Sequence, residues 1–177
     1  MRSVTQQTDT GSLRLSALVD PRTGLAIESL LRDHLRRSLA VAARDERFVG
    51  VLWLIISRGL PELVHRRVPD RVVRQCAQRV SRGIRGNDLA AAFDENTIVV
   101  GLTAMNAPSD ASIAGARLMI ALARPISVED RNQSVHFACG VAPASDRSIS
   151  VDGLLAHGRI AAVEAAAAGE PLRIYGG

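Results

Sequence analysis

Lysine is absent from this sequence: all 22 basic residues among its 177 are arginine. Arginine stays protonated at any physiological pH, so the sequence pI of about 10.3 accompanies a net charge of only +4. Aromatic residues make up 3% of the chain, which leaves few rings to stack on unpaired bases. The densest basic run, from Arg66 to Arg85, contains one acid, Asp70, and is typical of a solvated helix face. We therefore do not expect binding to nucleic acid.

Long apolar runs are also missing. The longest, residues 48–56, falls short of the roughly 18 to 20 residues that a membrane span needs. The first 12 residues are polar and lack the apolar core of a secretory signal. Both absences predict a soluble, cytoplasmic protein without a membrane segment.

Cysteine is scarce. Cys76 and Cys139 lie in apolar segments, with no companion at the spacing of a metal site, which predicts buried, reduced thiols. The four histidines show no metal spacing either: His34, His65, His136 and His157. The sequence therefore predicts neither a metal site nor a bound cofactor.

The apolar pattern predicts one α+β domain. Leucines at near-helical spacing from Leu25 to Leu39 follow Asp20-Pro21, which predicts a first helix that begins at Asp20. Residues 48–57 are apolar on both alternating faces, as in a central strand that is covered on both sides. The same criteria predict helices over 70–84, 110–124 and 151–168, and strands over 89–93, 97–102, 135–142 and 172–175. This order contains βαββαβ, the ferredoxin-like core, so we expect a mostly antiparallel central sheet surrounded by helices.

Four short motifs lie along these elements. They are DPRTGL at 20–25, DRVVRQCA at 70–77, RGND at 85–88 and GVA at 140–142. In the same order they are similar to D-x-L-T-G-L, G-D-x-V-L-x-x-V-A, R-x-x-D and S-x-G-x-A of the GGDEF family, the bacterial diguanylate cyclases that make cyclic di-GMP. The chain resembles this family over about 20–175, which implies the GGDEF, nucleotidyl-cyclase-like fold. We divide the chain into an N-terminal leader, 1–19, and a GGDEF-like domain, 20–177.

The positions that carry catalysis in the family hold other residues here. The D-x-D-x-F-K motif after the first strand aligns with ISRGLP at 56–61, and a phosphate-facing lysine of the last helix aligns with Ala166. The signature hairpin G-G-[DE]-E-F aligns with Asp94, Glu95, Asn96, Thr97 and Ile98. Phosphoryl transfer of this kind depends on metal ions that clamp the triphosphate, and carboxylates hold those ions. The resemblance therefore implies a degenerate GGDEF domain with no metal and no cyclase activity.

A second family feature is retained. Arg85 and Asp88 keep the residue types of the R-x-x-D inhibitory site, which binds cyclic di-GMP in active relatives, and Arg117 resembles an arginine that assists that site. The planar fork of arginine suits phosphates and guanine acceptors. The resemblance implies a cyclic di-GMP receptor in which a pair of ligand molecules cross-links two protomers. The alternative is a local surface ion pair between Arg85 and Asp88, with no ligand.

The other interpretation is a scaffold that works without nucleotide, as a homodimer or by docking a protein partner. The last helix has a small-residue face, which more often packs on the chain's own sheet than against a partner. Its members are Ala161, Ala162, Ala165, Ala166 and Ala168. The basic helix over 70–84 would attract an acidic partner. The sequence leaves the receptor and the scaffold both open.

Overall fold

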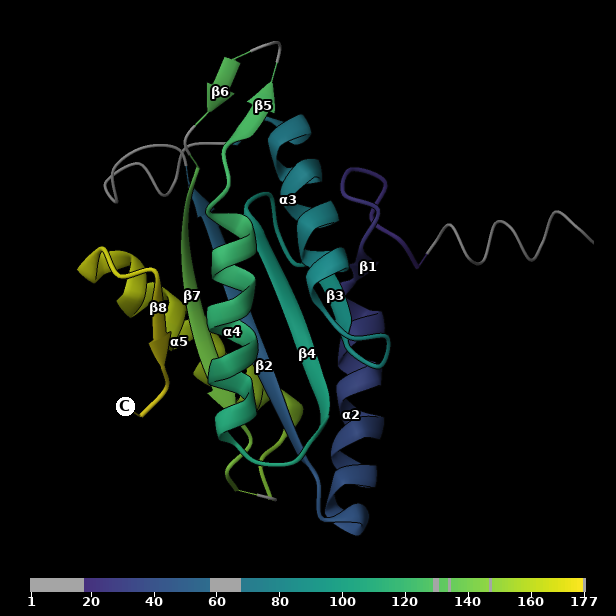
Figure 1. The fold of residues 1–177 in the computed structure, drawn as a ribbon. Coiled ribbons are helices and arrows are strands. Elements are labelled where there is room, and N and C mark those ends of the chain that lie inside the picture. The colour runs from purple at the N-terminus through teal and green to yellow at the C-terminus, as the bar shows by residue number, and fades with distance from the viewer. Residues whose placement is uncertain (1–17, 58–67, 129–130, 134, 147, 177) are drawn as a thin grey trace, which may run out of the picture.

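The structure is a computed structural model that describes residues 18–57, 68–128, 131–133, 135–146 and 148–176 (Figure 1). Its helices are α2 (Glu28–Asp45), α3 (Asp70–Gly83), α4 (Ser109–Leu122) and α5 (Val151–Ala168). Its strands are β1 (Ala26–Ile27), β2 (Phe48–Ser57), β3 (Leu89–Ala92), β4 (Thr97–Met105), β5 (Ile126–Val128), β6 (Arg131–Gln133), β7 (His136–Pro143) and β8 (Leu172–Ile174). No helix in these ranges is both long and apolar enough to cross a bilayer.

Six strands form one mixed sheet in the order β1-β3-β4-β2-β7-β8. The four inner strands pair antiparallel, and the edge strands β1 and β8 each run parallel to their neighbour. β2 lies between β4 and β7, and most of its residues are buried on both faces. The predicted α+β fold with a mostly antiparallel sheet is confirmed, and β2 is the predicted central strand.

Helices cover both faces of this sheet (Figure 1). On one face, α3 and α4 bury Val72, Cys76 and Leu118 against β2 and β4. On the other face, α2 and α5 bury Leu31 and Leu154 in a second apolar cluster. The sheet therefore separates two cores, and a surface feature belongs to one helical layer or the other.

The helix predicted to begin at Asp20 begins instead at Glu28. Asp20 caps a tight turn: its carboxylate accepts the backbone N–H of Thr23 at 2.9 Å, and its own N–H donates to Leu25 O at 2.8 Å. Gly24 has a φ of 75°, which a residue with a side chain rarely adopts. The DPRTGL motif is thus a closed loop that leads into β1, because its polar groups satisfy one another locally.

The last helix lies unusually close to β7. A Cβ atom on Gly140 would lie 2.1 Å from Gly158 O and 2.3 Å from Ala162 N. Only glycine permits this approach, which gives a physical reason for the glycine of the GVA motif. Ala161, Ala162 and Ala165 are fully buried here, so the small-residue face packs mainly on the chain's own sheet.

The other predicted elements occur with shifts of a few residues at their ends. Val151–Ala168 has the predicted bounds, since Ser150 caps its start and Gly169, with a φ of 69°, ends it. β4 extends to Met105, past the predicted end at Leu102. The two-stranded sheet β5-β6 was not predicted. The leader up to residue 17 and the segment 58–61 of the replaced D-x-D-x-F-K motif lie outside the described residues.

Candidate functional site

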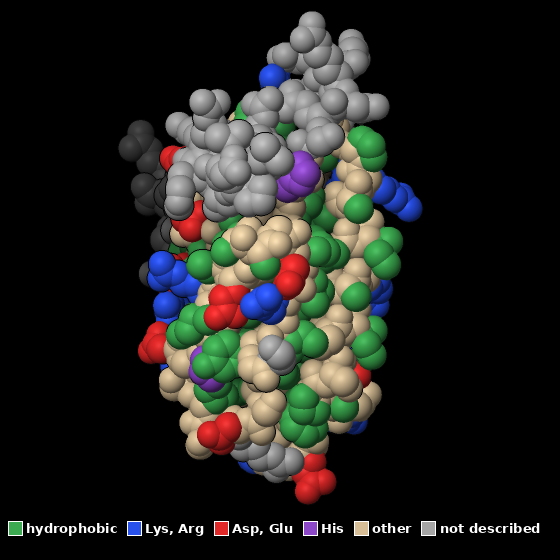
Figure 2. Space-filling model, turned by 90° about the vertical axis from the view of Figure 1, so that its left-hand side faces the viewer, with side chains coloured by type: hydrophobic (Ala, Val, Ile, Leu, Met, Phe, Trp, Pro, Cys, Tyr) green, Lys and Arg blue, Asp and Glu red, His purple; other side chains and the backbone are tan. Residues whose placement is uncertain are grey.

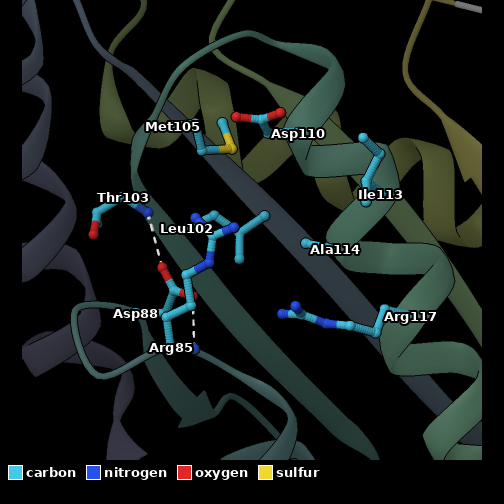
Figure 3. A pocket seen from close by; sticks show the side chains of 9 residues that line it. All are labelled: Arg85, Asp88, Leu102, Thr103, Met105, Asp110, Ile113, Ala114 and Arg117. Atoms are coloured by element: carbon cyan, nitrogen blue, oxygen red, sulfur yellow. Dashed lines mark hydrogen bonds between the residues drawn. The ribbon is translucent and has the colours of Figure 1, made fainter.

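The three residues predicted to bind a ligand line a single pocket. Arg85 and Asp88 lie in the loop between α3 and β3, and Arg117 lies on α4. The pocket has a volume of about 50 Å³. Figure 3 shows the side chains of Arg85 and Arg117 directed into it from opposite sides. A space of this size admits one edge of a ligand, with the rest of the molecule on the surface.

Asp88 is held by backbone donors. One carboxylate oxygen accepts the N–H of Arg85 at 3.0 Å, and the other accepts the N–H of Thr103 at 3.0 Å. The second contact ties the loop to β4, and Thr103 Oγ1 reinforces it by donating to Asn87 O at 2.9 Å. Asp88 therefore fixes the backbone that carries Arg85, and each oxygen retains acceptor capacity.

The guanidinium of Arg85 is unengaged. No hydrogen bond or ion pair joins it to any residue that the structure describes, and Arg85 is exposed. The surface ion pair with Asp88 that was the alternative interpretation is therefore not formed. Arg117 donates to Gly83 O at 3.2 Å, a contact that orients its fork without neutralising its charge.

The remaining wall of the pocket combines an acid with apolar side chains. Asp110 accepts the backbone N–H of Asn106 at 2.9 Å and that of Ala107 at 3.3 Å, so it stabilises the backbone that leads into α4. Leu102, Met105 and Ile113 supply apolar surface. Backbone N–H groups bind the carboxylates of Asp88 and Asp110, and neither carboxylate forms an ion pair with Arg85 or Arg117. The positive charges of both arginines are therefore available to a ligand.

The replaced signature forms the turn between β3 and β4. Asn96 N–H donates to Asp94 Oδ1 at 2.8 Å, and Phe93 N–H donates to Thr97 O at 3.0 Å. Asn96 Oδ1 accepts the N–H of Val68 at 3.3 Å. No residue of this turn has a positive φ, so it closes without the glycines of the family motif. Thr97 and Ile98 are buried, so only the first part of the turn is open to solvent.

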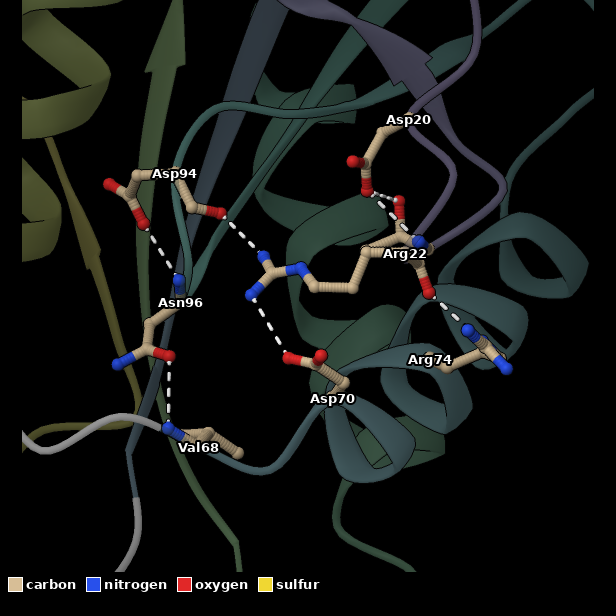
Figure 4. Close-up of polar contacts among 8 residues, drawn as sticks. Asp20, Arg22, Val68, Asp70, Arg74, Asp94 and Asn96 are labelled. Carbon is tan, nitrogen blue, oxygen red and sulfur yellow. Dashed lines mark hydrogen bonds and ion pairs between the residues drawn. The ribbon is translucent and has the colours of Figure 1, made fainter. Parts of the chain in front are cut away.

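Arg22 fills the space between this turn and the start of α3 (Figure 4). Its guanidinium donates to the backbone O of Asp94 at 2.9 Å and lies 3.6 Å from the carboxylate of Asp70. Its own carbonyl accepts Arg74 Nε at 2.9 Å. The side chain is only 18% exposed, so the DPRTGL loop, the turn and α3 are fastened together at this point.

Sequence reasoning missed the role of Arg22. The available signal was its position in DPRTGL, where the family motif D-x-L-T-G-L has leucine. A long cation that replaces an apolar residue in a loop needs an acceptor nearby. The acceptor is a carbonyl 72 residues away, which no local pattern indicates.

The described residues show no group of three or more histidine, cysteine or acidic side chains arranged to hold a metal ion. Burial raises the pKa of the Cys76 and Cys139 thiols to about 12, as expected for thiols in an apolar core. His157 stacks on Tyr175 with ring centroids 3.8 Å apart. The two thiols are thus part of the core, and His157 packs on an aromatic ring. His65 lies outside the described residues.

Solved structures of GGDEF domains are similar to this fold. The GGDEF domain of YfiN (TpbB) from Pseudomonas aeruginosa has a TM-score of 0.78 at 21% identity, over 86% of this chain and 98% of that chain. The GGDEF domain of FimX from the same organism gives 0.76 at 18% identity, over 89% and 98%. The GGDEF domain of DgcB from Caulobacter crescentus, solved in complex with c-di-GMP, gives 0.72 at 16% identity, over 91% and 97%.

At these identities the structural likeness establishes the fold alone. No curated protein matches the chain. A family model described as diguanylate cyclase, GGDEF domain, matches residues 17–171, which is most of the sequence. The chain therefore belongs to the GGDEF domain family.

Proposed function

We propose that this GGDEF domain is catalytically inactive and acts as a receptor for cyclic di-GMP, which it binds at the pocket of Arg85, Asp88 and Arg117. The observation that carries the proposal is that the guanidinium of Arg85 is available to a ligand. Its guanidinium is exposed and unengaged by the described residues, while the loop that bears it is fixed by Asp88. Because the loop is already ordered, binding of a ligand restricts the Arg85 side chain but does not have to order the backbone that carries it.

The ligand chemistry follows from the donors present. The fork of Arg85 is suited to the O6 and N7 acceptors of a guanine edge, and Arg117 to a phosphate oxygen. Asp88 retains acceptor capacity for a guanine N–H. The apolar side chains of Leu102 and Ile113 supply surface beside the base. Support from a relative is that the DgcB domain was solved in complex with c-di-GMP.

Loss of catalysis is the second part of the proposal. Asn96 and Thr97 stand where the family has carboxylates, and neither side chain replaces a carboxylate as a ligand for divalent cations. Ile56, near the end of β2, stands where the family has the first aspartate of D-x-D-x-F-K; its side chain is fully buried and carries no negative charge. Arg22 further fastens the turn to α3. Without carboxylates at these family positions, no metal ion is held there to neutralise the charge that develops on a triphosphate during transfer.

The assignment is tested by equilibrium dialysis of cyclic di-GMP with single variants. Arg85→Ala and Arg117→Ala should each weaken binding about tenfold or more, because each removes charge-assisted hydrogen bonds. Arg82→Ala is the matched control, since it removes an exposed arginine of α3 that does not line the pocket. Equal affinity in all four proteins would place the ligand elsewhere and reject the pocket as its site.

A scaffold function is the second candidate, favoured by one observation. Ile113 and Ile120, spaced two turns apart on α4, are 65% and 74% exposed. Large exposed aliphatic side chains on one helix face are typical of contact surfaces. Sedimentation of the chain without ligand tests this role. A dimer that Ile120→Asp disrupts would support the scaffold, and a monomer that dimerises only with cyclic di-GMP would support the receptor.

A further inference from the structure

A positively charged surface lies over α3 and α4. Residues 70–88 and 109–124, which contain these two helices, include seven of the 22 arginines but only three of the 18 acidic residues. The two segments thus account for the whole formal net charge of +4. By contrast, charges of both signs are scattered among apolar side chains on the side of the molecule that carries α5 and β8 (Figure 2). The excess positive charge of the chain is therefore concentrated on one helical layer.

The arginines of this layer keep their positive charge available. The guanidinium groups of Arg82, Arg85 and Arg124 form no hydrogen bond or ion pair with any residue that the structure describes, and all three residues are exposed. Arg79 and Arg117 donate to backbone carbonyls, which orient a guanidinium without neutralising its charge. All five side chains therefore still carry a charge that an anion can neutralise.

The acidic side chains of the layer do not cancel that charge. Asp70 lies 3.6 Å from Arg22, which is outside the two segments. Asp88 and Asp110 accept backbone N–H groups, and neither carboxylate forms an ion pair with an arginine in the described part of the chain. The surface of the layer consequently attracts an anionic partner.

Two large aliphatic side chains project from the same layer. Ile113 and Ile120 are 65% and 74% exposed, and they lie seven residues apart on α4, about 10 Å along its axis. The opposite side of α4 buries Leu118 and Leu122 in the core. Figure 3 shows Ile113 and Arg117 on adjacent turns of α4. The outer side of α4 therefore presents apolar and cationic side chains together.

We propose that this layer binds the surface of an anionic lipid bilayer, without a helix that crosses it. The contact surface, which we call the α3–α4 face, consists of Arg82, Arg85, Ile113, Arg117, Ile120 and Arg124. The two isoleucines enter between the lipid headgroups, where the acyl chains begin. The arginine forks bind lipid phosphates bidentately, and their aliphatic stems cover the apolar boundary. Each arginine close to an anionic membrane surface strengthens the attraction.

A bilayer fits the α3–α4 face better than a second copy of the chain does. Two such faces in contact would bring their arginines together, and like charges across an interface oppose association. An acidic protein would match the arginines, but isoleucines that project this far need a surface that yields to them, as the headgroup region of a bilayer does. The proposal does not rest on cyclic di-GMP binding, although Arg85 and Arg117 belong to both surfaces.

Vesicle flotation with the full chain tests the proposal. The chain should float with vesicles of phosphatidylcholine and phosphatidylglycerol in equal parts, and it should stay in solution with phosphatidylcholine alone. Salt at about 0.5 M should release most of the bound chain, because screening weakens the attraction between exposed charges. Equal flotation with both kinds of vesicle, or with neither, would overturn the proposal.

Two variants outside the cyclic di-GMP pocket locate the contact. Ile120→Asp and Arg124→Glu should each weaken vesicle binding about tenfold or more, since each places a negative charge on the α3–α4 face. Ile160→Asp and Arg159→Glu are the matched controls, because they make the same changes at exposed positions of α5, in the other layer. Neither Ile120 nor Arg124 lines the pocket, so cyclic di-GMP binding should persist in both variants. Equal vesicle binding by the natural chain and all four variants would place the contact elsewhere and overturn the proposal.

Quenching by brominated lipids tests whether α4 itself enters the bilayer. Trp53, the single tryptophan, packs in the α2 and α5 layer, so the emission of the natural chain should not change with these lipids. The emission of Ile120→Trp should be quenched on anionic vesicles, since the new ring would lie among the headgroups. An unquenched Ile120→Trp would overturn the proposal. Vesicle binding that Arg124→Glu abolishes and Ile120→Asp leaves unchanged would also overturn it, in favour of a purely electrostatic contact such as an acidic protein makes.

Discussion

Arg22 donates a hydrogen bond of 2.9 Å to the backbone carbonyl of Asp94, across 72 residues of sequence. The contact joins the DPRTGL loop to the turn that replaces the family signature. Arg22 also lies 3.6 Å from Asp70 at the start of α3, so one guanidinium connects three segments of the chain. A residue that departs from the family motif thus stabilises the turn that departs most from it.

Arg22→Ala should lower the free energy of unfolding by about 1 to 2 kcal/mol, because it removes one charged donor from the Asp94 carbonyl and one from the Asp70 carboxylate. Urea denaturation measures the change. Arg124→Ala, at an exposed position two residues after the end of α4, should leave the free energy of unfolding within about 0.5 kcal/mol of the original. Equal effects of the two substitutions would show that the Arg22 contacts contribute no net stability.

Gly140→Ala should destabilise the chain by about 2 kcal/mol or more, since the added methyl group would overlap backbone atoms of α5. Backbone atoms yield less readily than the end of a flexible side chain. Gly86→Ala is the control: its Cβ would meet nothing within 4 Å. Thermal unfolding of both variants measures the difference in stability. An unchanged melting temperature for Gly140→Ala would show that α5 lies farther from β7 than these distances require.

Much of this fold is predictable from local patterns. The strand Phe48–Ser57 is apolar on both faces because helices cover both, and the helix Val151–Ala168 carries its own signals in Ser150 and Gly169. The start of the first helix is not predictable in this way. Asp20 has the residue type of a helix cap, yet its carboxylate closes a turn with Thr23 instead.

The candidate pocket was predictable only in part. The R-x-x-D spacing indicated Arg85 and Asp88, and the helical pattern placed Arg117 on α4, which packs beside α3. Their convergence depends on the bond from the Thr103 N–H to Asp88, which joins the loop after α3 to β4. Contacts of this kind join distant segments, so they have no signature in any single stretch of sequence.

Both thiols should be unreactive in the native state. Burial raises the pKa of Cys76 and of Cys139 to about 12, so neither forms a thiolate near pH 8, where a disulfide reagent is used. Titration with such a reagent should detect almost no thiol in the folded chain and both in urea. Rapid native reaction of either cysteine would contradict the described burial.

The same shifts predict a loss of stability at high pH. Above the ordinary thiol pKa of 9.0, the unfolded chain releases protons that the folded chain retains up to about 12. Stability contributed by the protonated thiols is therefore complete below pH 9 and falls as the pH rises above it. Urea midpoints measured across this range should fall less in the double variant Cys76→Ala, Cys139→Ala than in the natural chain.

Restoring the signature alone should not restore catalysis. A variant that carries Gly-Gly-Asp-Glu-Phe at 94–98 still lacks the two aspartates of D-x-D-x-F-K, because Ile56 and Arg58 stand at those positions. Incubation with GTP and either magnesium or manganese, followed by chromatography, should detect no cyclic di-GMP. Product formation by this variant would show that the other replaced positions are dispensable, and product formation by the natural chain would refute the proposed inactivity.

Calorimetric titration of the natural chain with cyclic di-GMP, with GTP and magnesium in a parallel cell, tests the receptor proposal most directly. The account predicts saturable binding of cyclic di-GMP with a Kd on the order of micromolar or tighter, and no heat from GTP. Absence of binding with cyclic di-GMP would contradict the receptor function and leave the scaffold.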